Sequence, residues 1–222
     1  TSIGHNSTNI TVKNSYFYTR NNGGSTTFTF SWASNCTIDN CTLRAEGNVG
    51  NLLYLNTFNI VGAPTGVPLN NYNVISNNKI YGKEGSAISV GLMVEGKGNL
   101  IVNNTLYKSS ISTSFGGANP SDNIYVGNTM TEGSGLTAQA NSIIYGNNVT
   151  GALSTGTNSV AYDNIVGGKM TVAADATAYN NTVGNGLTTG GANAVIENNT
   201  ITGAVTINKV GTTFVGNDVA GT

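Results

Sequence analysis

Apolar residues alternate with polar ones over short stretches of the chain, and each alternation breaks at one position. Around residues 193–202, Ala194 and Ile196 alternate with polar neighbours, Asn199 interrupts, and Ile201 resumes the apolar pattern. Side chains of a β-strand point to opposite faces in turn, so alternation over a few residues predicts a strand. The interruption predicts a tight corner, because asparagine tolerates left-handed backbone angles better than other non-glycine residues.

Equivalents of Asn199 recur along the chain, each three residues after an apolar position and two before another. They are Ser15, Cys41, Asn78, Asn104, Asn128, Asn147, Asn164, Asn181, Asn199 and Asn217, at successive intervals of 26, 37, 26, 24, 19, 17, 17, 18 and 18 residues. A second set of positions repeats at the same period in the C-terminal half: Leu136, Leu153, Met170, Leu187 and Val205. Recurrence at this period is typical of a solenoid.

Stacked coils of short strands predict an all-β parallel β-helix that forms one domain over residues 1–222. Coils of about 24–26 residues make a wide part over 1–120, and coils of 17–18 residues make a narrow, regular part over 121–222. The 37-residue interval after Cys41 leaves open an extra coil or a lateral loop. Equivalent asparagines, stacked about 4.8 Å apart, are expected to hydrogen-bond as a structural ladder. Its predicted members are Asn78, Asn104, Asn128, Asn147, Asn164, Asn181, Asn199 and Asn217.

Composition narrows the classes of partner. The chain holds 9 Lys and Arg against 10 Asp and Glu, with no basic patch to neutralise phosphates, so we expect no nucleic-acid partner. No apolar run approaches the ~20 residues of a membrane helix, so we expect no membrane insertion in this segment. Cys36 and Cys41 are interpreted as buried reduced thiols, with a local disulfide as the alternative. His5 is the only histidine, and we expect neither a metal nor a cofactor.

One outward column of residues carries tyrosines and charged groups in the wide part of the chain. Because tyrosine has an apolar face and a polar tip, such a column on adjacent coils favours stacking on sugar rings. The alternative is ordinary surface packing. The ligand-binding candidates are Tyr18, Arg44, Tyr81 and Tyr107, followed two residues further on by Arg20, Glu46 and Lys83.

A second column is apolar. If Ile101 and Ile144 face the core, their neighbours point outward and form a stripe that is typical of an interface with a partner chain or domain. A shifted register that buries part of the stripe is the alternative. The interface candidates are Leu100, Val102, Ile124, Val126, Ile143, Tyr145, Val160, Tyr162 and Tyr179.

Few side chains are candidates for catalysis. A glycosidase needs two facing carboxylates, but the acidic residues are scattered among the repeats, and no catalytic residue is predicted. Arg20, Arg44 and Glu46 come closest to a lyase site. A file of Thr137, Ser154, Thr171, Thr188 and Thr206 raises ice binding as a minor alternative, although the second threonine rank that such a face needs is missing.

The copies Asn147-Asn148-Val149-Thr150-Gly151 and Asn198-Asn199-Thr200-Ile201-Thr202-Gly203 carry a family likeness. The chain resembles the adhesin-like cell-surface proteins of methanogenic archaea over residues 5–219. The resemblance implies arrays of right-handed parallel β-helix repeats of the pectate-lyase-like superfamily fold, displayed outside the cell. No catalytic motif of that fold maps onto this sequence.

Together these observations predict a non-catalytic surface adhesin or stalk segment, extracellular, that contacts glycans or a partner protein and is able to form an oligomer. We expect this segment to belong to a longer chain. A polysaccharide-active enzyme (a lyase, hydrolase or epimerase) or a phage tailspike is the alternative, and the groove that would favour it is expected around Arg20, Arg44 and Glu46.

Overall fold

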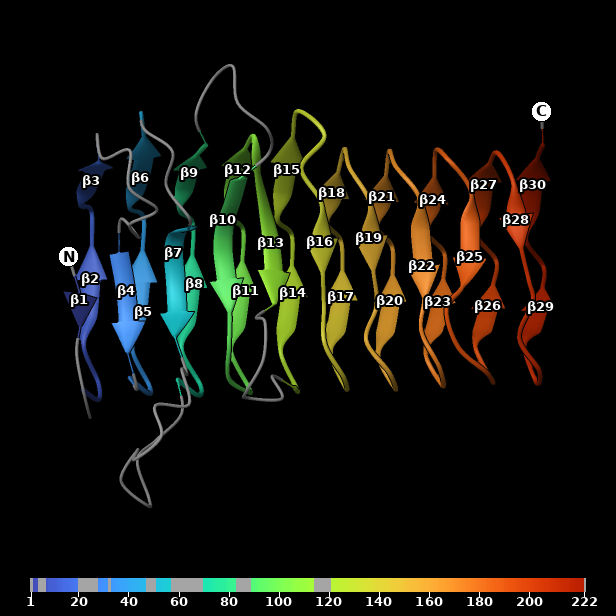
Figure 1. Ribbon diagram of the computed structural model, residues 1–222, viewed down its shortest axis with the longest axis horizontal. Coiled ribbons are helices and arrows are strands. Elements are labelled where there is room, and N and C mark those ends of the chain that lie inside the picture. The colour runs from blue at the N-terminus through green and yellow to red at the C-terminus, as the bar shows by residue number, and fades with distance from the viewer. Residues whose placement is uncertain are drawn as a thin grey trace.

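The computed structural model is an all-β rod of ten stacked coils (Figure 1). It describes residues 2–3, 7–19, 28–31, 33–46, 51–56, 70–82, 89–113 and 121–221. Within these ranges every regular element is a strand, and the strands form three ten-stranded sheets in which all pairs are parallel. Each coil contributes one strand to each sheet, which confirms the predicted parallel β-helix.

We name the sheets I, II and III in the order in which the chain first enters them. Sheet I contains β1 (Ser2–Ile3), β4 (Phe28–Ser31), β7 (Asn51–Asn56), β10 (Ser89–Val94), β13 (Ser109–Thr113), β16 (Leu136–Thr137), β19 (Leu153–Ser154), β22 (Met170–Val172), β25 (Leu187–Thr189) and β28 (Val205–Thr206). Sheet II contains β2 (Thr11–Lys13), β5 (Thr37–Asp39), β8 (Val74–Ser76), β11 (Leu100–Val102), β14 (Ile124–Val126), β17 (Ile143–Tyr145), β20 (Val160–Tyr162), β23 (Thr177–Tyr179), β26 (Val195–Glu197) and β29 (Thr213–Val215). Sheet III contains β3 (Tyr16–Thr19), β6 (Thr42–Ala45), β9 (Lys79–Tyr81), β12 (Thr105–Tyr107), β15 (Thr129–Thr131), β18 (Asn148–Val149), β21 (Ile165–Val166), β24 (Thr182–Val183), β27 (Thr200–Thr202) and β30 (Asp218–Ala220).

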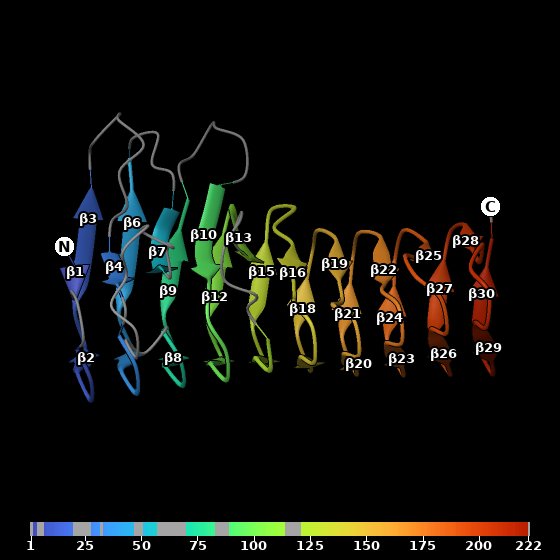
Figure 2. The ribbon, with the colours of Figure 1, turned by 60° about the horizontal axis from the view of Figure 1, so that its bottom comes forward.

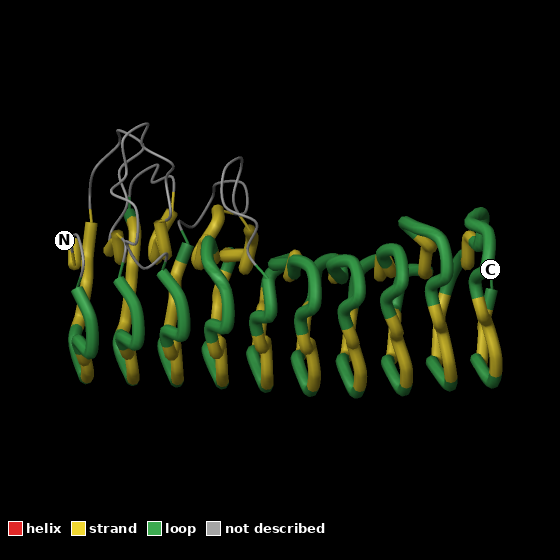
Figure 3. Tube along the Cα trace, turned by 90° about the horizontal axis from the view of Figure 1, so that it is seen from below, coloured by secondary structure: helices red, strands yellow, loops and turns green. Residues whose placement is uncertain are grey.

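The core is a set of columns in which each inward side chain lies on its equivalent in the next coil. Ile101 pairs with Ile75 on one side and Tyr125 on the other, and all three are fully buried. The sequence alternation sets this arrangement, since the middle residue of every three-residue strand in sheet II points inward while its neighbours point outward. Figure 3 shows the coils stacked along the rod, with the strands of neighbouring coils lying side by side.

Two left-handed corners flank sheet II in every coil. One residue with positive φ precedes the strand and another follows it, as at Asn35 (φ 55°) and Asn40 (φ 51°) in the second coil. The predicted tight corner is present, but its left-handed residue is not the ladder asparagine. It is the residue immediately before, such as Asn103 beside Asn104 or Asn198 beside Asn199. The ladder position itself points inward and is buried.

The coils narrow along the rod at sheet I and the segments joined to it. Strands β7 and β10 are six residues long, whereas β16 and β19 have two, while the sheet II strands keep three residues throughout. The 37-residue interval holds no extra coil among its described residues, because β7 pairs with β4 and β10 and is that coil's own sheet I strand. Residues 57–69, at the end of that interval, lie outside the described ranges.

Candidate functional site

An asparagine ladder runs inside the corner between sheets II and III. The Asn104 side-chain oxygen accepts hydrogen bonds from the backbone N–H and side-chain amide of Asn78, at 3.0 and 2.9 Å. Its own amide donates to Asn128 (3.0 Å) and to the Ile75 carbonyl (2.8 Å) of the preceding coil. The same pattern repeats up to Asn217, so each rung satisfies buried backbone groups of its neighbours. The predicted ladder is present at all eight positions.

A second ladder, which sequence reasoning missed, lies at the other corner of sheet II in the third to fifth coils. Asn99 donates its backbone N–H and its side-chain amide to the Asn123 side-chain oxygen, at 2.9 and 3.1 Å. Asn73 bonds to Asn99 in the same way through its backbone N–H. Ser142 and Ser159 continue the column, with one bond of 3.0 Å from backbone to hydroxyl. The signal in the sequence was an asparagine five residues before each anchor in three consecutive coils.

Each ladder ends at a cysteine on its N-terminal side. The Cys41 thiol lies 3.4 Å from the Asp39 carbonyl and 3.7 Å from the Val12 carbonyl, the places where a ladder amide would donate. Cys36 makes the equivalent contacts with Ser34 and Ser7 in the second ladder. Both thiols are free and buried, and burial raises the pKa of Cys36. The cysteines therefore act as small buried donors, in agreement with the reduced-thiol interpretation.

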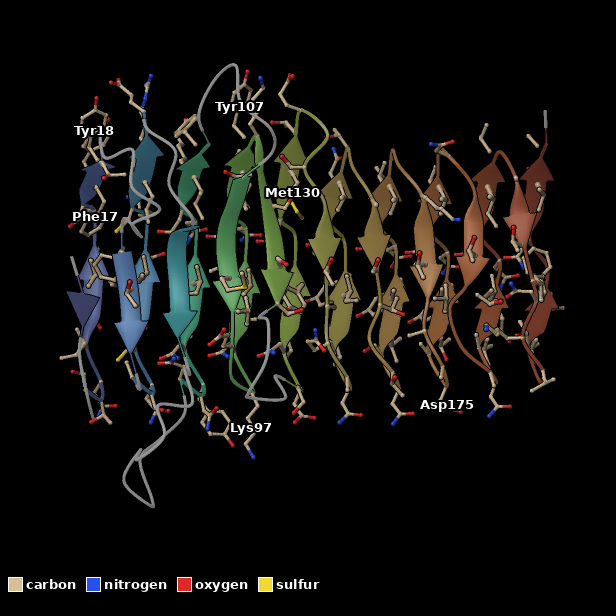
Figure 4. The ribbon with its side chains drawn as sticks, in the orientation of Figure 1. Phe17, Tyr18, Lys97, Tyr107, Met130 and Asp175 are labelled. Carbon is tan, nitrogen blue, oxygen red and sulfur yellow. The ribbon has the colours of Figure 1, made fainter. Side chains whose placement is uncertain are left out.

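Sheet III brings four of the predicted ligand-binding residues into one row. Tyr18 pairs in register with Arg44, Arg44 with Tyr81, and Tyr81 with Tyr107. The Tyr81 and Tyr107 rings are 6.4 Å apart between centroids and tilted by 47°, and both side chains are half-buried. Figure 4 places Tyr18 and Tyr107 along the edge of the rod where the strands of sheet III lie.

The remaining predicted residues of this column are only partly placed. Glu46 is exposed and directly follows β6, two residues after Arg44. Arg20 and Lys83 fall outside the described residues. The alternation of sheet III adds two residues that sequence reasoning did not include, Tyr16 and Lys79, each two residues before a member of the row and therefore on the same face.

Tyr16 extends the aromatic surface at the N-terminal end of the row. It is 63% exposed, and its ring stacks with that of Tyr18 at 6.3 Å and an interplanar angle of 16°. Lys79 is exposed and pairs in register with Thr42 and Thr105. Arg44 and Lys79 together give the row two cations, so we define the tyrosine row as Tyr16, Tyr18, Arg44, Lys79, Tyr81 and Tyr107.

Sheet II places all nine predicted interface residues outward in two adjacent rows. Ile101 and Ile144 are fully buried, so their neighbours in each strand face away from the core. Ile143 is 40% exposed, and the other eight are half-buried against one another. The register is unbroken across these coils, so no slip buries the stripe. We call these nine residues, with Thr177, the apolar face: Leu100, Val102, Ile124, Val126, Ile143, Tyr145, Val160, Tyr162, Thr177 and Tyr179.

Three tyrosines of the apolar face form a continuous stack. The Tyr145 and Tyr162 rings are 5.1 Å apart with a 5° interplanar angle, and Tyr162 and Tyr179 are 5.0 Å apart with 2°. Their ring faces are occupied by one another, so edges and hydroxyls point outward. Burial of the middle ring, with neighbouring Tyr179, Tyr145 and Asp163, raises the pKa of Tyr162. The Tyr162 phenol therefore stays neutral at physiological pH.

The N-terminal end of sheet II is polar. Asp39 accepts hydrogen bonds from the Ser76 hydroxyl (2.7 Å) and the Asn77 amide (2.8 Å), which hold the pKa of its carboxyl below the usual range. Lys13 lies 3.9 Å from the same carboxylate and contributes in the same direction. This end of the sheet therefore carries one charge of each sign.

The threonine file forms an outward row on sheet I, with Thr137, Ser154, Thr171, Thr188 and Thr206 paired in register. Two of the five, Thr137 and Thr206, are exposed, and the other three are half-buried. The companion positions two residues on remain Gln139, Gly156, Ala173, Gly190 and Asn208. The row is thus a single rank of hydroxyls.

Among the described residues, no group of three or more His, Cys, Asp or Glu side chains is placed to hold a metal ion. In that same part of the chain, no helix has the length and apolar character needed to cross a membrane. Comparisons with family models, with curated proteins and with solved structures each find no match. The candidate functional surfaces are the tyrosine row of sheet III and the apolar face of sheet II, which the strand register brings together.

Proposed function

We propose that this chain is a non-catalytic, extracellular adhesin or stalk segment that binds a glycan along the tyrosine row of sheet III. The rod supplies a stiff support, since its coils share a continuous core and eight of them share a laddered corner. The observation that carries the proposal is the register of Tyr18, Arg44, Tyr81 and Tyr107 on consecutive coils. The likeness to archaeal cell-surface adhesins supports the same function and location.

The chemistry of the row suits a sugar chain. Tyrosine rings pack against the C–H faces of sugars, and their hydroxyls exchange hydrogen bonds with sugar hydroxyls. Arg44 lies between Tyr18 and Tyr81, where its guanidinium can bind a carboxylate in bidentate geometry. Lys79 adds a second cation on the same face. We therefore expect acidic glycans to bind more tightly than neutral ones, with an affinity that falls as salt screens the two cations.

A glycan array with the purified chain, run beside a product assay on the same polysaccharides, tests this function. Binding without turnover is expected, and the Tyr81→Ala/Tyr107→Ala double variant should lose it. Ile165→Ala is the matched control, because Ile165 is an exposed residue of sheet III three coils beyond the row. Arg44→Gln should weaken acidic ligands selectively.

Turnover would instead favour the second candidate function, a polysaccharide-active enzyme or a phage tailspike using Arg44 and Glu46. These two residues lie at the end of one strand and on the surface, which is the observation that keeps this alternative open. If the chain shows no binding and no turnover, the proposed glycan contact is contradicted. The rod would then act only as a spacer. Ice binding, the minor alternative, would show as thermal hysteresis that depends on Thr171, and the single hydroxyl rank argues against it.

A further inference from the structure

The apolar face of sheet II is a flat surface with a polar border. Its ten side chains come from five consecutive coils and carry no charge. Figure 2 shows labelled strands of sheet II (β2, β8, β20, β23, β26 and β29) in one row along the lower edge of the rod. Residues at the corners on both sides of the sheet, such as Asn103, Asn141 and Asp163, are exposed and polar. An apolar centre within a polar rim is the anatomy of a protein interface.

From this geometry we propose that two copies of the chain pack face to face through sheet II, with their rod axes antiparallel and the two-fold axis at Ile124. Because β14 belongs to the fifth coil, the fourth coil of one copy faces the sixth coil of the second copy, and the first coil faces the ninth. Ile124 meets its own copy, and Leu100 meets Ile143 of the second copy. The strands run parallel to the two-fold axis. The first residue of a strand therefore faces the first residue of the opposing strand, and the third residue faces the third. The proposal concerns a different face from the tyrosine row and does not depend on the glycan function.

The charged residues on the strands of sheet II favour this orientation, while Asp122, the exposed acid at the corner before β14, meets its own copy at the axis. Among the outward positions of sheet II, the charged residues are Lys13 in the first coil, Asp39 in the second and Glu197 in the ninth. A two-fold axis at the fifth coil brings Lys13 against Glu197 of the second copy, at both ends of the interface. Asp39 then faces the Tyr179 hydroxyl. Parallel packing would instead reverse the strands, so Lys13 would face Thr11 and Glu197 would face Val195, with no ion pair at either end.

Lys13 remains available for this contact. Its distance of 3.9 Å from Asp39 is at the limit of an ion pair, and 55% of its side chain is exposed. Glu197 is half-buried on the outer surface of β26 beside Tyr179, with which it pairs in register. Both residues occupy the last position of their strands, so the two-fold operation aligns them.

The size of the surface predicts a weak, reversible dimer. Nine coils at about 4.8 Å and strands of three residues give a footprint of roughly 40 Å by 10–15 Å. Each copy would therefore cover about 400–600 Å², and the total of about 1,000 Å² lies near the lower limit of specific association. The two-fold symmetry makes every contact occur twice, which is how a small patch becomes sufficient.

Sedimentation velocity over a range of concentrations tests the proposal on the full chain. We expect a monomer–dimer equilibrium that Ile124→Lys abolishes, because two lysines would meet at the axis. Thr171→Lys, an outward substitution on sheet I, is the matched control and should leave the dimer intact. Circular dichroism of both variants shows whether the coils remain folded.

The charge pair gives an independent test that does not depend on the apolar centre. Lys13→Glu and Glu197→Lys should each raise the dimer dissociation constant about tenfold, since two pairs become repulsive. The double variant Lys13→Glu/Glu197→Lys should restore the wild-type value. A monomer at every concentration, a dimer that tolerates Ile124→Lys, or a double variant without restoration would each overturn the antiparallel dimer.

Discussion

The wide N-terminal coils and the narrow C-terminal coils have the same backbone around sheet II and differ at sheet I. In both parts, a left-handed residue, a three-residue strand and a second left-handed residue lead into the ladder, as at Tyr72 to Asn78 and at Asn158 to Asn164. Sheet I and its connections differ, with strands of four to six residues from β4 to β13 and of two or three beyond. Sheet II and its corners, which are the same in every coil, determine how the coils stack. Sheet I, which varies, determines how wide each coil is.

The difference extends to how each part satisfies its buried polar groups. The third to fifth coils carry asparagines at both corners of sheet II, whereas the sixth to ninth coils keep only the ladder next to sheet III and place serine or alanine at the other corner. A second set of amide bonds therefore satisfies buried backbone groups at the other corner of these three coils. The surface chemistry divides in the same way, since the tyrosine row ends in the fourth coil.

The largest expected effect comes from removing one rung in each part. Asn164→Ala deletes an oxygen that accepts two bonds from Asn147 and an amide that donates to Ile144 and Asn181. Buried groups left without partners cost about 1–3 kcal/mol each, so we expect a loss of about 3–5 kcal/mol in the free energy of unfolding, measured in urea. Asn104→Ala should cost less, because Asn99 still holds the other corner of its coil.

The exposed Asn148→Ala is the control for this pair, since its side chain lies outside the ladder. Hydrogen exchange of the Asn147 amide locates the damage. Equal losses for Asn104→Ala and Asn164→Ala would contradict a stabilising role for the second ladder.

A smaller and opposite effect is expected at Tyr125, in the coil where the rod begins to narrow. Its side chain is fully buried in the core, and its hydroxyl has no hydrogen-bond partner among the residues that the structure describes. Burial also raises its pKa, so the phenol stays neutral. Tyr125→Phe should therefore increase the free energy of unfolding by about 1 kcal/mol. Tyr145→Phe, on the outer face, is the control with no expected change, and a destabilised Tyr125→Phe variant would contradict the unpaired hydroxyl.

The smallest effect is a pH dependence confined to the wide part. The folded state lowers the pKa of Asp39, so its contribution to stability is present above the unfolded value of about 4 and is lost as pH falls through the folded value. The difference in stability between the wild type and Asp39→Asn should thus shrink between pH 6 and pH 3. A difference that stays constant with pH would show that the carboxylate charge is not what Ser76 and Asn77 stabilise.

The sequence was sufficient for the stack, the ladder and the outward faces, because every coil gives equivalent residues the same surroundings. It could not show which asparagine of a pair such as Asn198 and Asn199 takes the left-handed conformation and which joins the ladder, because asparagine is suited to both roles. Strand alternation decides between them, because only the second lies inward. The second ladder was harder to find, since three asparagines give way to serine and alanine.

The surface sites were only partly predictable for a related reason. Tyr81 and Tyr107 could be aligned because their coils repeat, whereas Arg20 and Lys83 belong to connections whose lengths differ from coil to coil. Repetition fixes register, and where repetition stops the sequence no longer tells which side chains meet. The proposed contact between Lys13 and Glu197 depends on their lying in the first and ninth coils. These coil numbers are known only from the complete strand order of the structure.

The ladder also makes the length of the rod a quantity that gene duplication can change in whole steps. Coils of 17 and 18 residues already follow one another at Asn164, Asn181 and Asn199 without any break in the hydrogen bonds. An in-frame duplication that begins and ends at a rung would therefore add one coil and about 4.8 Å of reach. Reach can thus evolve separately from the residues that the rod displays.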